Sequence, residues 1–375
     1  MKKLFALVLT LALPACAPKP TPAMPSPQPP TPTSQSPAPS PQSPTSAPQL
    51  PTPSPQPPTP TPEPKIKFTQ LTQGGCCVQP SFSPDGARAL YLDKPSANAQ
   101  TGIYAVPINQ PLSQPQFVIA HPGPFSADMR YAEDLIGGRT VITRLADGVA
   151  WVIPSGGRRA SFSPDATRIT WSVGEETGGF DVRKSDIYVA DVDGKNAKLI
   201  ATRYGGGVMA WMPDSKQILL GGKEKRADKL AKIGVMDLAT GAVRPLFEAE
   251  RLRNTLLSPD GKWLVYLLTA SENGAGGTFV IPLDGSSAAP RQLDIFGAFQ
   301  WRDGSHLLYI PLKVNAPSSE LWQIDAQTGA MTQLIAAAPD SPFKIGGGDW
   351  DVSPDGNSIL YLNARDRNIW VASLR

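Results

Sequence analysis

One short phrase constrains the fold of this chain more than any other feature: a Ser-Pro-Asp-Gly turn followed by a run of β-forming residues. Clear copies of this phrase begin at Ser81, Ser161, Ala210, Leu256 and Asp351, and weaker copies begin at Phe125 and Gln300. The aspartates that anchor successive copies lie 37 to 52 residues apart. A repeat of this length is typical of propellers and solenoids.

Each copy has a simple physical interpretation. The proline presets the second position of a type I turn, the aspartate can bond the local backbone, and the glycine supplies the positive φ that closes a hairpin. The residues after the turn are rich in Leu, Ile, Val, Tyr and Trp, which is typical of a buried strand. Two further strand-like segments follow, so a unit holds four short strands, as a propeller blade does. We therefore predict an all-β, seven-bladed β-propeller over residues 65–375, with six or eight blades as alternatives.

The ends of this region predict how the ring closes. The last unit ends at Arg375 with its third strand, and it has no fourth. The segment from Ile66 to Thr72 looks like a fourth strand that belongs to no unit of its own. Pairing the two would remove both open sheet edges, so we predict that this N-terminal strand closes the ring.

The repeats resemble those of TolB-like propellers, whose mark is a Trp/Phe-Ser-Pro-Asp-Gly turn, an alternating apolar strand and an Ile-Tyr-Val-x-Asp/Asn strand. The resemblance covers essentially all of residues 65–375. It implies the fold and suggests a role in envelope integrity by analogy at the fold level. TolB itself carries an additional N-terminal domain, and here a proline-rich tract stands in that place.

Residues 1–15 have the pattern of a bacterial signal peptide. Lys2 and Lys3 precede an apolar run about ten residues long, too short to span a bilayer as a mature helix. The residues Leu13-Pro14-Ala15-Cys16 resemble the lipobox of bacterial lipoproteins, although Pro14 departs from its usual small residues. The resemblance implies cleavage before Cys16 and lipidation of its thiol. The alternative is a plain signal peptide with Cys16 left as a free thiol.

Residues 16–64 are predicted to be a tether. Between Pro18 and Pro64 the chain has 21 of its 42 prolines, with mainly Ser, Thr, Gln and Ala between them. Such a segment has too few apolar side chains for a core, and we expect a disordered, extended polyproline II spacer. It would act as a stalk that lifts the domain from the membrane; a ligand for proline-recognition modules is the alternative.

Charge excludes two classes of partner. The formal net charge is +3, and two of the positive residues lie in the predicted signal peptide. A nearly neutral mature chain lacks the basic stripe of a nucleic-acid-binding protein and the charge for electrostatic docking on anionic lipid. We therefore expect no nucleic acid and contact with the membrane through the lipid anchor only, either at the outer membrane or at the outer leaflet of the cytoplasmic membrane.

The sequence predicts no catalytic residues, no cofactor and no metal site. There is no Gly-x-Ser-x-Gly nucleophile elbow. The two histidines, His121 and His306, are expected at opposite ends of their blades and hence apart. The stretch from Asp191 to Gly194 superficially resembles a calcium loop but lacks its later ligands, so we interpret it as a hairpin turn.

A candidate binding face is predicted where loops between units meet loops between second and third strands. Adjacent Cys76 and Cys77 could stay reduced, form a vicinal disulfide or bind a soft metal, and we expect a structural role ahead of ligand contact. Glycine-rich loops that carry long polar or aromatic groups would share this face, because Arg, Tyr and Trp are frequent hot-spot residues. The candidates are Cys76, Cys77, Arg158, Arg159, Arg203, Tyr204, Arg251, Arg253 and Trp350.

These features favour a monomeric protein of the bacterial cell envelope, outside the cytoplasm, that is not an enzyme. The first hypothesis is a tethered interaction module for an envelope protein or a peptidoglycan-associated partner. The second is a receptor for a small molecule, glycan or peptide in the central channel. A lyase or hydrolase that uses channel carboxylates is a distant third.

Overall fold

The computed structural model describes residues 66–375 except 76, 122, 251, 270–275 and 286–288. The predicted signal peptide (1–15), the lipidation site Cys16 and the tether (16–64) lie outside the described residues. The same is true of two candidate binding residues, Cys76 and Arg251. Among the described residues, no helix is long and apolar enough to cross a membrane.

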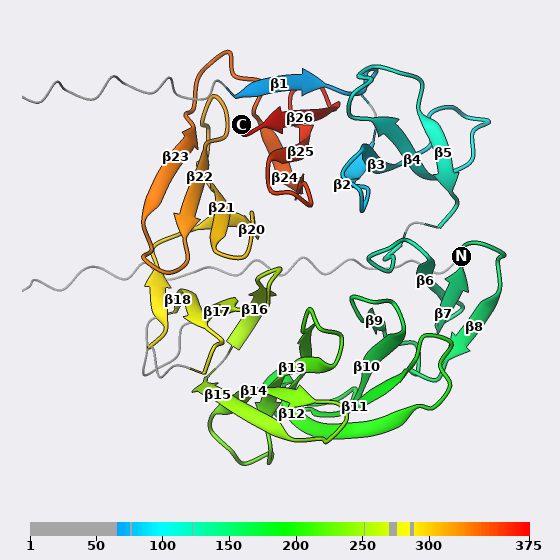
Figure 1. The fold of residues 1–375 in the computed structure, drawn as a ribbon, viewed down its shortest axis with the longest axis vertical. Coiled ribbons are helices and arrows are strands. Elements are labelled where there is room, and N and C mark those ends of the chain that lie inside the picture. The colour runs from blue at the N-terminus through cyan, green and yellow to red at the C-terminus, as the bar shows by residue number, and fades with distance from the viewer. Residues whose placement is uncertain (1–65, 76, 122, 251, 270–275, 286–288) are drawn as a thin grey trace, which may run out of the picture. The chain divides into compact units, whose positions relative to one another are not determined.

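The described chain forms antiparallel sheets arranged around a central axis in chain order, which is a β-propeller (Figure 1). The first sheet contains β2 (Val78–Phe82), β3 (Arg88–Asp93), β4 (Gly102–Pro107) and β5 (Gln116–Ile119). The next contains β6 (Tyr131–Ile136), β7 (Arg139–Arg144) and β8 (Ala150–Ile153). Two later four-stranded sheets contain β16 (Leu252–Leu257), β17 (Trp263–Leu268), β18 (Gly277–Pro282) and β19 (Arg291–Leu293), then β20 (Gly297–Trp301), β21 (His306–Pro311), β22 (Leu321–Asp325) and β23 (Met331–Ile335).

The third and fourth repeat units share one sheet of seven strands. Its members are β9 (Ser161–Phe162), β10 (Arg168–Gly174), β11 (Lys184–Asp191), β12 (Lys198–Trp211), β13 (Gln217–Lys223), β14 (Ala231–Asp237) and β15 (Val243–Ala249). The long strand β12 pairs with β11 along its first half and with β13 along its second. Hydrogen bonding therefore groups the described strands into six sheets, because the third and fourth repeat units are joined in one.

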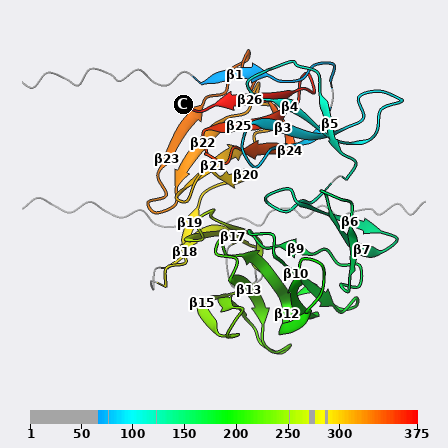
Figure 2. The ribbon, with the colours of Figure 1, turned by 45° about the vertical axis from the view of Figure 1, so that its right-hand side comes forward.

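The last sheet is completed by the first strand of the domain. It contains β24 (Ile345–Val352), β25 (Ser358–Asn363), β26 (Ile369–Ser373) and β1 (Lys67–Gln70). Strand β1 runs antiparallel to β26, with Phe68 opposite Ala372, and Figure 2 shows the two strands side by side. This pairing confirms the predicted closure by an N-terminal strand.

The Ser-Pro-Asp-Gly turns are stabilised by a repeated pair of side chains. In the first turn the Ser83 hydroxyl bonds Asp85 at 2.5 Å and accepts the backbone N–H of Arg88 at 3.0 Å. The same serine–aspartate bond recurs in Ser126–Asp128, Ser163–Asp165, Ser258–Asp260 and Ser353–Asp355. Because such bonds favour the ionised carboxylate, the Ser353 hydroxyl and then Asn357 lower the pKa of Asp355 to about 2. The aspartates are turn formers, as the sequence indicated.

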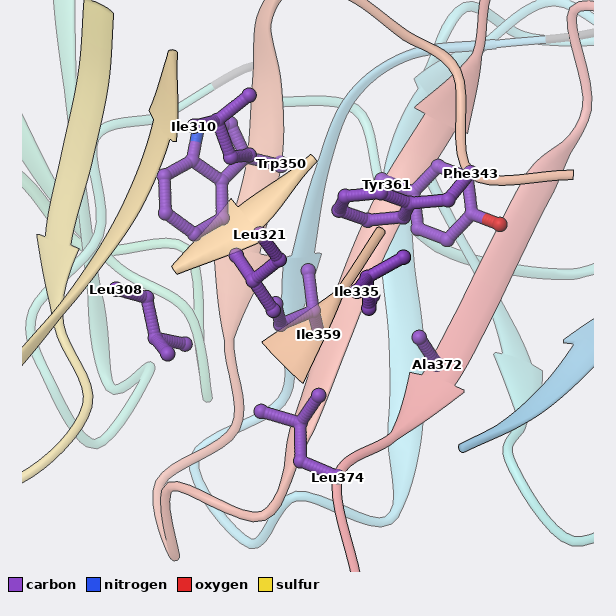
Figure 3. Close-up of a cluster of buried hydrophobic side chains, with 10 residues drawn as sticks. All are labelled: Leu308, Ile310, Leu321, Ile335, Phe343, Trp350, Ile359, Tyr361, Ala372 and Leu374. Atoms are coloured by element: carbon purple, nitrogen blue, oxygen red, sulfur yellow. The ribbon is translucent and has the colours of Figure 1, made fainter. Parts of the chain in front are cut away.

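The core lies between neighbouring sheets. Figure 3 shows the cluster between the sixth and seventh repeat units, in which Phe343 packs edge-on against Tyr361 with ring centroids 5.1 Å apart. Two tryptophans that precede the turns add bonds between units. The indole N–H of Trp211 donates to the carbonyl oxygen of Ser161 at 3.0 Å, and that of Trp301 donates to Leu256 at 3.1 Å.

Candidate functional site

A cavity of about 610 Å³ opens where the third, fourth and fifth repeat units meet. Strands β12, β13 and β16 supply most of its wall, and the 3₁₀ turn η1 (Phe180–Val182) borders it. Five of the lining residues are the glycines Gly205, Gly206, Gly207, Gly221 and Gly222. This volume falls within the range of about 300–1,000 Å³ that is usual for ligand sites.

The glycines are required by close backbone contacts. A Cβ added to Gly206 would lie 2.2 Å from the carbonyl oxygen of Gly221, and one added to Gly205 would lie 2.6 Å from the backbone of Asp181. The register of β12 against β13 shifts between Tyr204 and Gly207, so the strand bulges at this point. The wall of the cavity is therefore bare backbone over this stretch.

The loop of residues 175–183 reaches over from the third unit and is held by Arg253 of β16. The Arg253 guanidinium contacts the Asp181 carboxylate at 2.9 Å and lies 4.6 Å from the centre of the Phe180 ring. Phe180 is nevertheless 55% exposed, so its ring remains accessible to a partner at the edge of the cavity.

A second ion pair fixes the start of the same loop. Arg226, from the loop between β13 and β14, contacts Glu175 at 2.8 Å and lies 5.3 Å from the Tyr204 ring centre. The backbone N–H of Lys184, and then Arg226, lower the pKa of Glu175, so this carboxylate stays ionised. The segment between the third and fourth units and the loops between second and third strands thus meet here.

A second cavity of about 860 Å³ adjoins the first, since Asn254 lines both. Its wall comes from β16–β18 and β20–β21, and it is mostly apolar, with Phe299, Ile310 and Ile345 among its members. Two lining side chains are unusually exposed for their type: Phe296 at 75% and Leu312 at 62%. We call the two adjoining cavities the groove.

Charge is distributed unequally along the groove. The first cavity contains Lys223, Lys229 and Arg253 against Asp181 and Glu250, and Asp181 is already paired with Arg253. A smaller cavity of about 180 Å³ beside it adds Arg158, Arg183 and Glu175, of which Glu175 is paired with Arg226. In the second cavity Lys313 is paired with Glu320 at 2.6 Å. The end at the third and fourth units is therefore cationic, and the other end is apolar.

Four of the predicted residues lie in or beside the groove. Arg253 lines the first cavity and Arg158 the small one. Arg203 and Tyr204 were expected in a loop, but they lie inside the continuous strand β12. Arg203 is half-buried, its Nη1 donates to the Thr202 carbonyl oxygen, and its buried Nε has no partner among the described residues. The Arg226 guanidinium lies over the Tyr204 ring. Arg203 and Tyr204 therefore support the wall behind the cavity.

The other predicted residues lie elsewhere. Arg159 contacts Glu133, a fully buried side chain of β6, at 3.4 Å. Trp350 was expected on an exposed loop but is only 5% exposed on strand β24, where its ring belongs to the core cluster of Figure 3. Cys77 forms a disulfide and packs, partly buried, against a core cluster that includes Leu71. These three do not join the groove.

Each histidine pairs with an aspartate. His121 pairs with Asp134, and His306 pairs with Asp303 at 3.0 Å, each within its own unit. The Asp191–Gly194 stretch is a tight turn, closed by the Gly194 N–H on the Asp191 carbonyl oxygen at 2.8 Å. Within the described part of the chain, no group of three or more His, Cys, Asp or Glu side chains could hold a metal ion.

The residues that shape the groove most were not predicted from the sequence. Phe180 and Asp181 belong to a loop between a second and a third strand, and no local sequence pattern marks its tip as part of a cavity. Phe296 and Leu312 each stand beside a strand end, and a large apolar residue outside a strand was the available signal.

The similarity of this chain to known proteins is a similarity of fold. No family model matches the chain, and no curated protein does. An oligogalacturonate lyase in complex with manganese is similar, with 15% identity, a TM-score of 0.53 and coverage of 83% of this chain and 96% of that one. Oligogalacturonate lyase from Vibrio parahaemolyticus has 12% identity and a TM-score of 0.50, with coverage of 82% of this chain and 96% of that one. TolB from Acinetobacter baumannii has 16% identity and a TM-score of 0.41, with coverage of 82% of this chain and 79% of that one.

Proposed function

We propose that this chain is a TolB-like, cell-envelope protein whose propeller is a protein-interaction module, and that the groove grips the partner. The observation that carries the proposal is the groove itself, where two adjoining cavities present bare glycine backbone, exposed Phe180 and Phe296, and two lysines, Lys223 and Lys229, that form no ion pair with a described residue. Exposed aromatic side chains beside polar groups are typical of binding hot spots. The partner would be an envelope protein or a peptidoglycan-associated one, and the chain itself would be a monomer.

The location follows from the first 64 residues. A lipid on Cys16 would anchor the chain to the outer membrane or to the outer leaflet of the cytoplasmic membrane, and the tether would hold the propeller away from it. A fatty acid analogue that labels the wild-type chain in cells, but not the Cys16→Ala variant, would support the anchor. Equal labelling of both would contradict it.

We propose that the ring has seven repeat units, with β12 serving two of them. The turns contact one another around the axis in the order two, three, four, five, six, seven, one. The contacts are Arg130 to Asp165, Asp165 to Ser215, Pro213 to Gly261, Asp260 to Gly304, Arg302 to Gly356 and Pro354 to Gly86. A seven-unit count gives every turn its own place in this series.

We propose that the chain is not an enzyme. Three acids line the first cavity and its small neighbour: Asp181 is paired with Arg253, Glu175 is paired with Arg226, and Glu250 forms no ion pair among the described residues. General acid–base catalysis by two carboxylates would therefore lack a second unpaired group there. The second candidate is a receptor for a small molecule, glycan or peptide, and the 610 Å³ volume of the first cavity favours it. A lyase or hydrolase remains a distant third.

Site-specific cross-linking tests the interaction module. A photoreactive residue is placed at Lys229 or at Phe296 of the full-length chain in cells, and adducts are identified by mass spectrometry. Lys216 is the matched control, because it is exposed and precedes β13, whereas the groove is at the other end of that strand. We expect one protein to be captured from both groove positions and not from Lys216. Equal capture from Lys216, or no adduct from the groove, would contradict the proposal.

A further inference from the structure

The two ends of the groove differ in chemistry, and this difference restricts what can fill it. Lys223 and Lys229 line the first cavity and form no ion pair within the described residues, while Arg253 shares its charge with Asp181. Of the two acids in that cavity, Asp181 is paired with Arg253, and Glu250 forms no ion pair with a described residue, so Glu250 is the one acid there that can offset the lysines. A ligand group at this end gains most by carrying negative charge.

The second cavity favours apolar ligand groups. Its exposed Phe296 and Leu312 and the neighbouring Val314, which is 82% exposed, lie around a mostly apolar wall. The lysines there are engaged: Lys313 with Glu320, and Lys344 with the carbonyl oxygen of Ala316 at 2.5 Å. Burial of apolar surface is the main gain available at this end.

The size of the groove favours an extended ligand. Each cavity alone has the volume of an ordinary small-molecule site, so one small molecule would leave the other cavity empty. The Cβ positions of Gly205, Gly206 and Gly207 lie against other parts of this chain, so these glycines let β12 pack closely and leave a wall without side chains of its own over that stretch. An acidic glycan could satisfy the cationic end, but it carries no apolar side chains for the other.

We propose that the groove binds an extended acidic peptide segment, with carboxylates at Lys223 and Lys229 and apolar side chains at Phe296 and Leu312. This inference rests on the proposed function, since it names the chemistry of the partner segment that the interaction module would grip. The ion pairs of the 175–183 loop remain intact in the bound state, because the two lysines supply the free charge.

Fluorescence anisotropy with the full-length chain and defined peptides tests it. The probe is an octapeptide of four glutamates followed by leucines and phenylalanines, and its controls replace the glutamates by glutamine or the apolar residues by serine. We expect each control peptide to bind at least tenfold more weakly than the probe. Binding of the probe should also weaken at high salt, because the lysine–carboxylate attraction is screened.

Variants locate the binding. Lys229→Glu should weaken binding of the probe at least tenfold. Phe296→Ser should weaken binding of the probe but leave binding of the serine-containing control peptide unchanged. Lys216→Glu, the matched charge reversal at the other end of β13, should leave binding unchanged. Thermal melting verifies that each variant is folded, and Lys223→Glu provides a second reversal if Lys229→Glu is not.

Three outcomes would overturn the inference. The first is that the probe and its control peptides bind equally well, or that none of them binds. The second is that neither lysine reversal weakens binding of the probe. The third is that an acidic oligosaccharide displaces the probe and that its own binding depends on Lys229 in the same way. If the cross-links from Lys229 and Phe296 to one protein persist in any of these cases, the interaction module stands and only the acidic-peptide chemistry fails. If the cross-links are also absent, the proposed function fails with it.

Discussion

The carboxylate of Asp351 accepts a hydrogen bond of 2.8 Å from the backbone N–H of Phe82, although 269 positions separate the two residues. Asp351 lies on β24 of the last sheet and Phe82 on β2 of the first. The other carboxylate oxygen accepts the N–H of Val352 at 2.9 Å. The ring is therefore closed twice, by the pairing of β1 with β26 and by this bond between inner strands.

Replacing Asp351 should loosen this second closure. In Asp351→Ala the buried N–H of Phe82 loses its acceptor, and we expect a loss of about 1 kcal/mol or more in the free energy of unfolding. Asp351→Asn retains a carbonyl oxygen and should lie closer to wild type. Urea denaturation measures both, with the exposed Asp340→Ala as the control. Equal stabilities for Asp351→Ala and Asp340→Ala would show that the bond contributes nothing.

The indole bond between units can be separated from indole packing. Trp301 donates to the Leu256 carbonyl oxygen at 3.1 Å, whereas the equally buried Trp171 has an Nε1 without a partner among the described residues. Trp301→Phe loses ring volume and a bond, while Trp171→Phe loses volume alone. We therefore expect Trp301→Phe to be the more destabilising, by about 1 kcal/mol in chemical denaturation. The reverse order would refute a stabilising role for the bond.

Local chemistry explains what the sequence could predict. The turns at Asp85 and its equivalents depend on residues two to five positions apart, so their sequence pattern is sufficient. The closure by β1 was also predictable, because a missing fourth strand and an unassigned strand can be counted. The continuity of β12 was not, since the glycines at 205–207 are typical of a loop and here form a bulge within a strand.

The groove escaped prediction because its defining pairs are distant in sequence. Glu175 and Arg226 are 51 positions apart, and Asp181 and Arg253 are 72 apart. Trp350 shows the converse problem: its glycine-rich neighbours are typical of an exposed loop, while its ring fills the core between two units. Which aromatic side chains are buried depends on how the sheets pack, and a repeat pattern alone does not contain that information.

The pH dependence of stability should report on Glu133. Burial raises the pKa of Glu133, and Arg159 only partly offsets this. The folded state therefore holds the proton more tightly than the unfolded state, so this group's contribution to stability is full below the unfolded pKa and is lost as pH rises through the folded pKa. Glu133→Gln should accordingly gain stability over wild type as pH rises from 4 to 7, measured by urea denaturation. Glu175, whose pKa is lowered, should give the opposite slope when changed to Gln.

The bulge at Gly206 should be a sensitive point of the groove wall. An alanine Cβ there would lie 2.2 Å from the carbonyl oxygen of Gly221, so β12 and β13 must separate to admit it. Overpacking of this kind costs about 1–3 kcal/mol, and we expect Gly206→Ala to lower the free energy of unfolding by that amount. Gly179→Ala is the matched control, since its φ is −65° and no atom lies within 4 Å of its added Cβ. Because the displaced backbone is the wall of the first cavity, Gly206→Ala should also reduce cross-linking from Lys229, and indistinguishable behaviour of the two alanine variants would show that the glycines do not shape the groove.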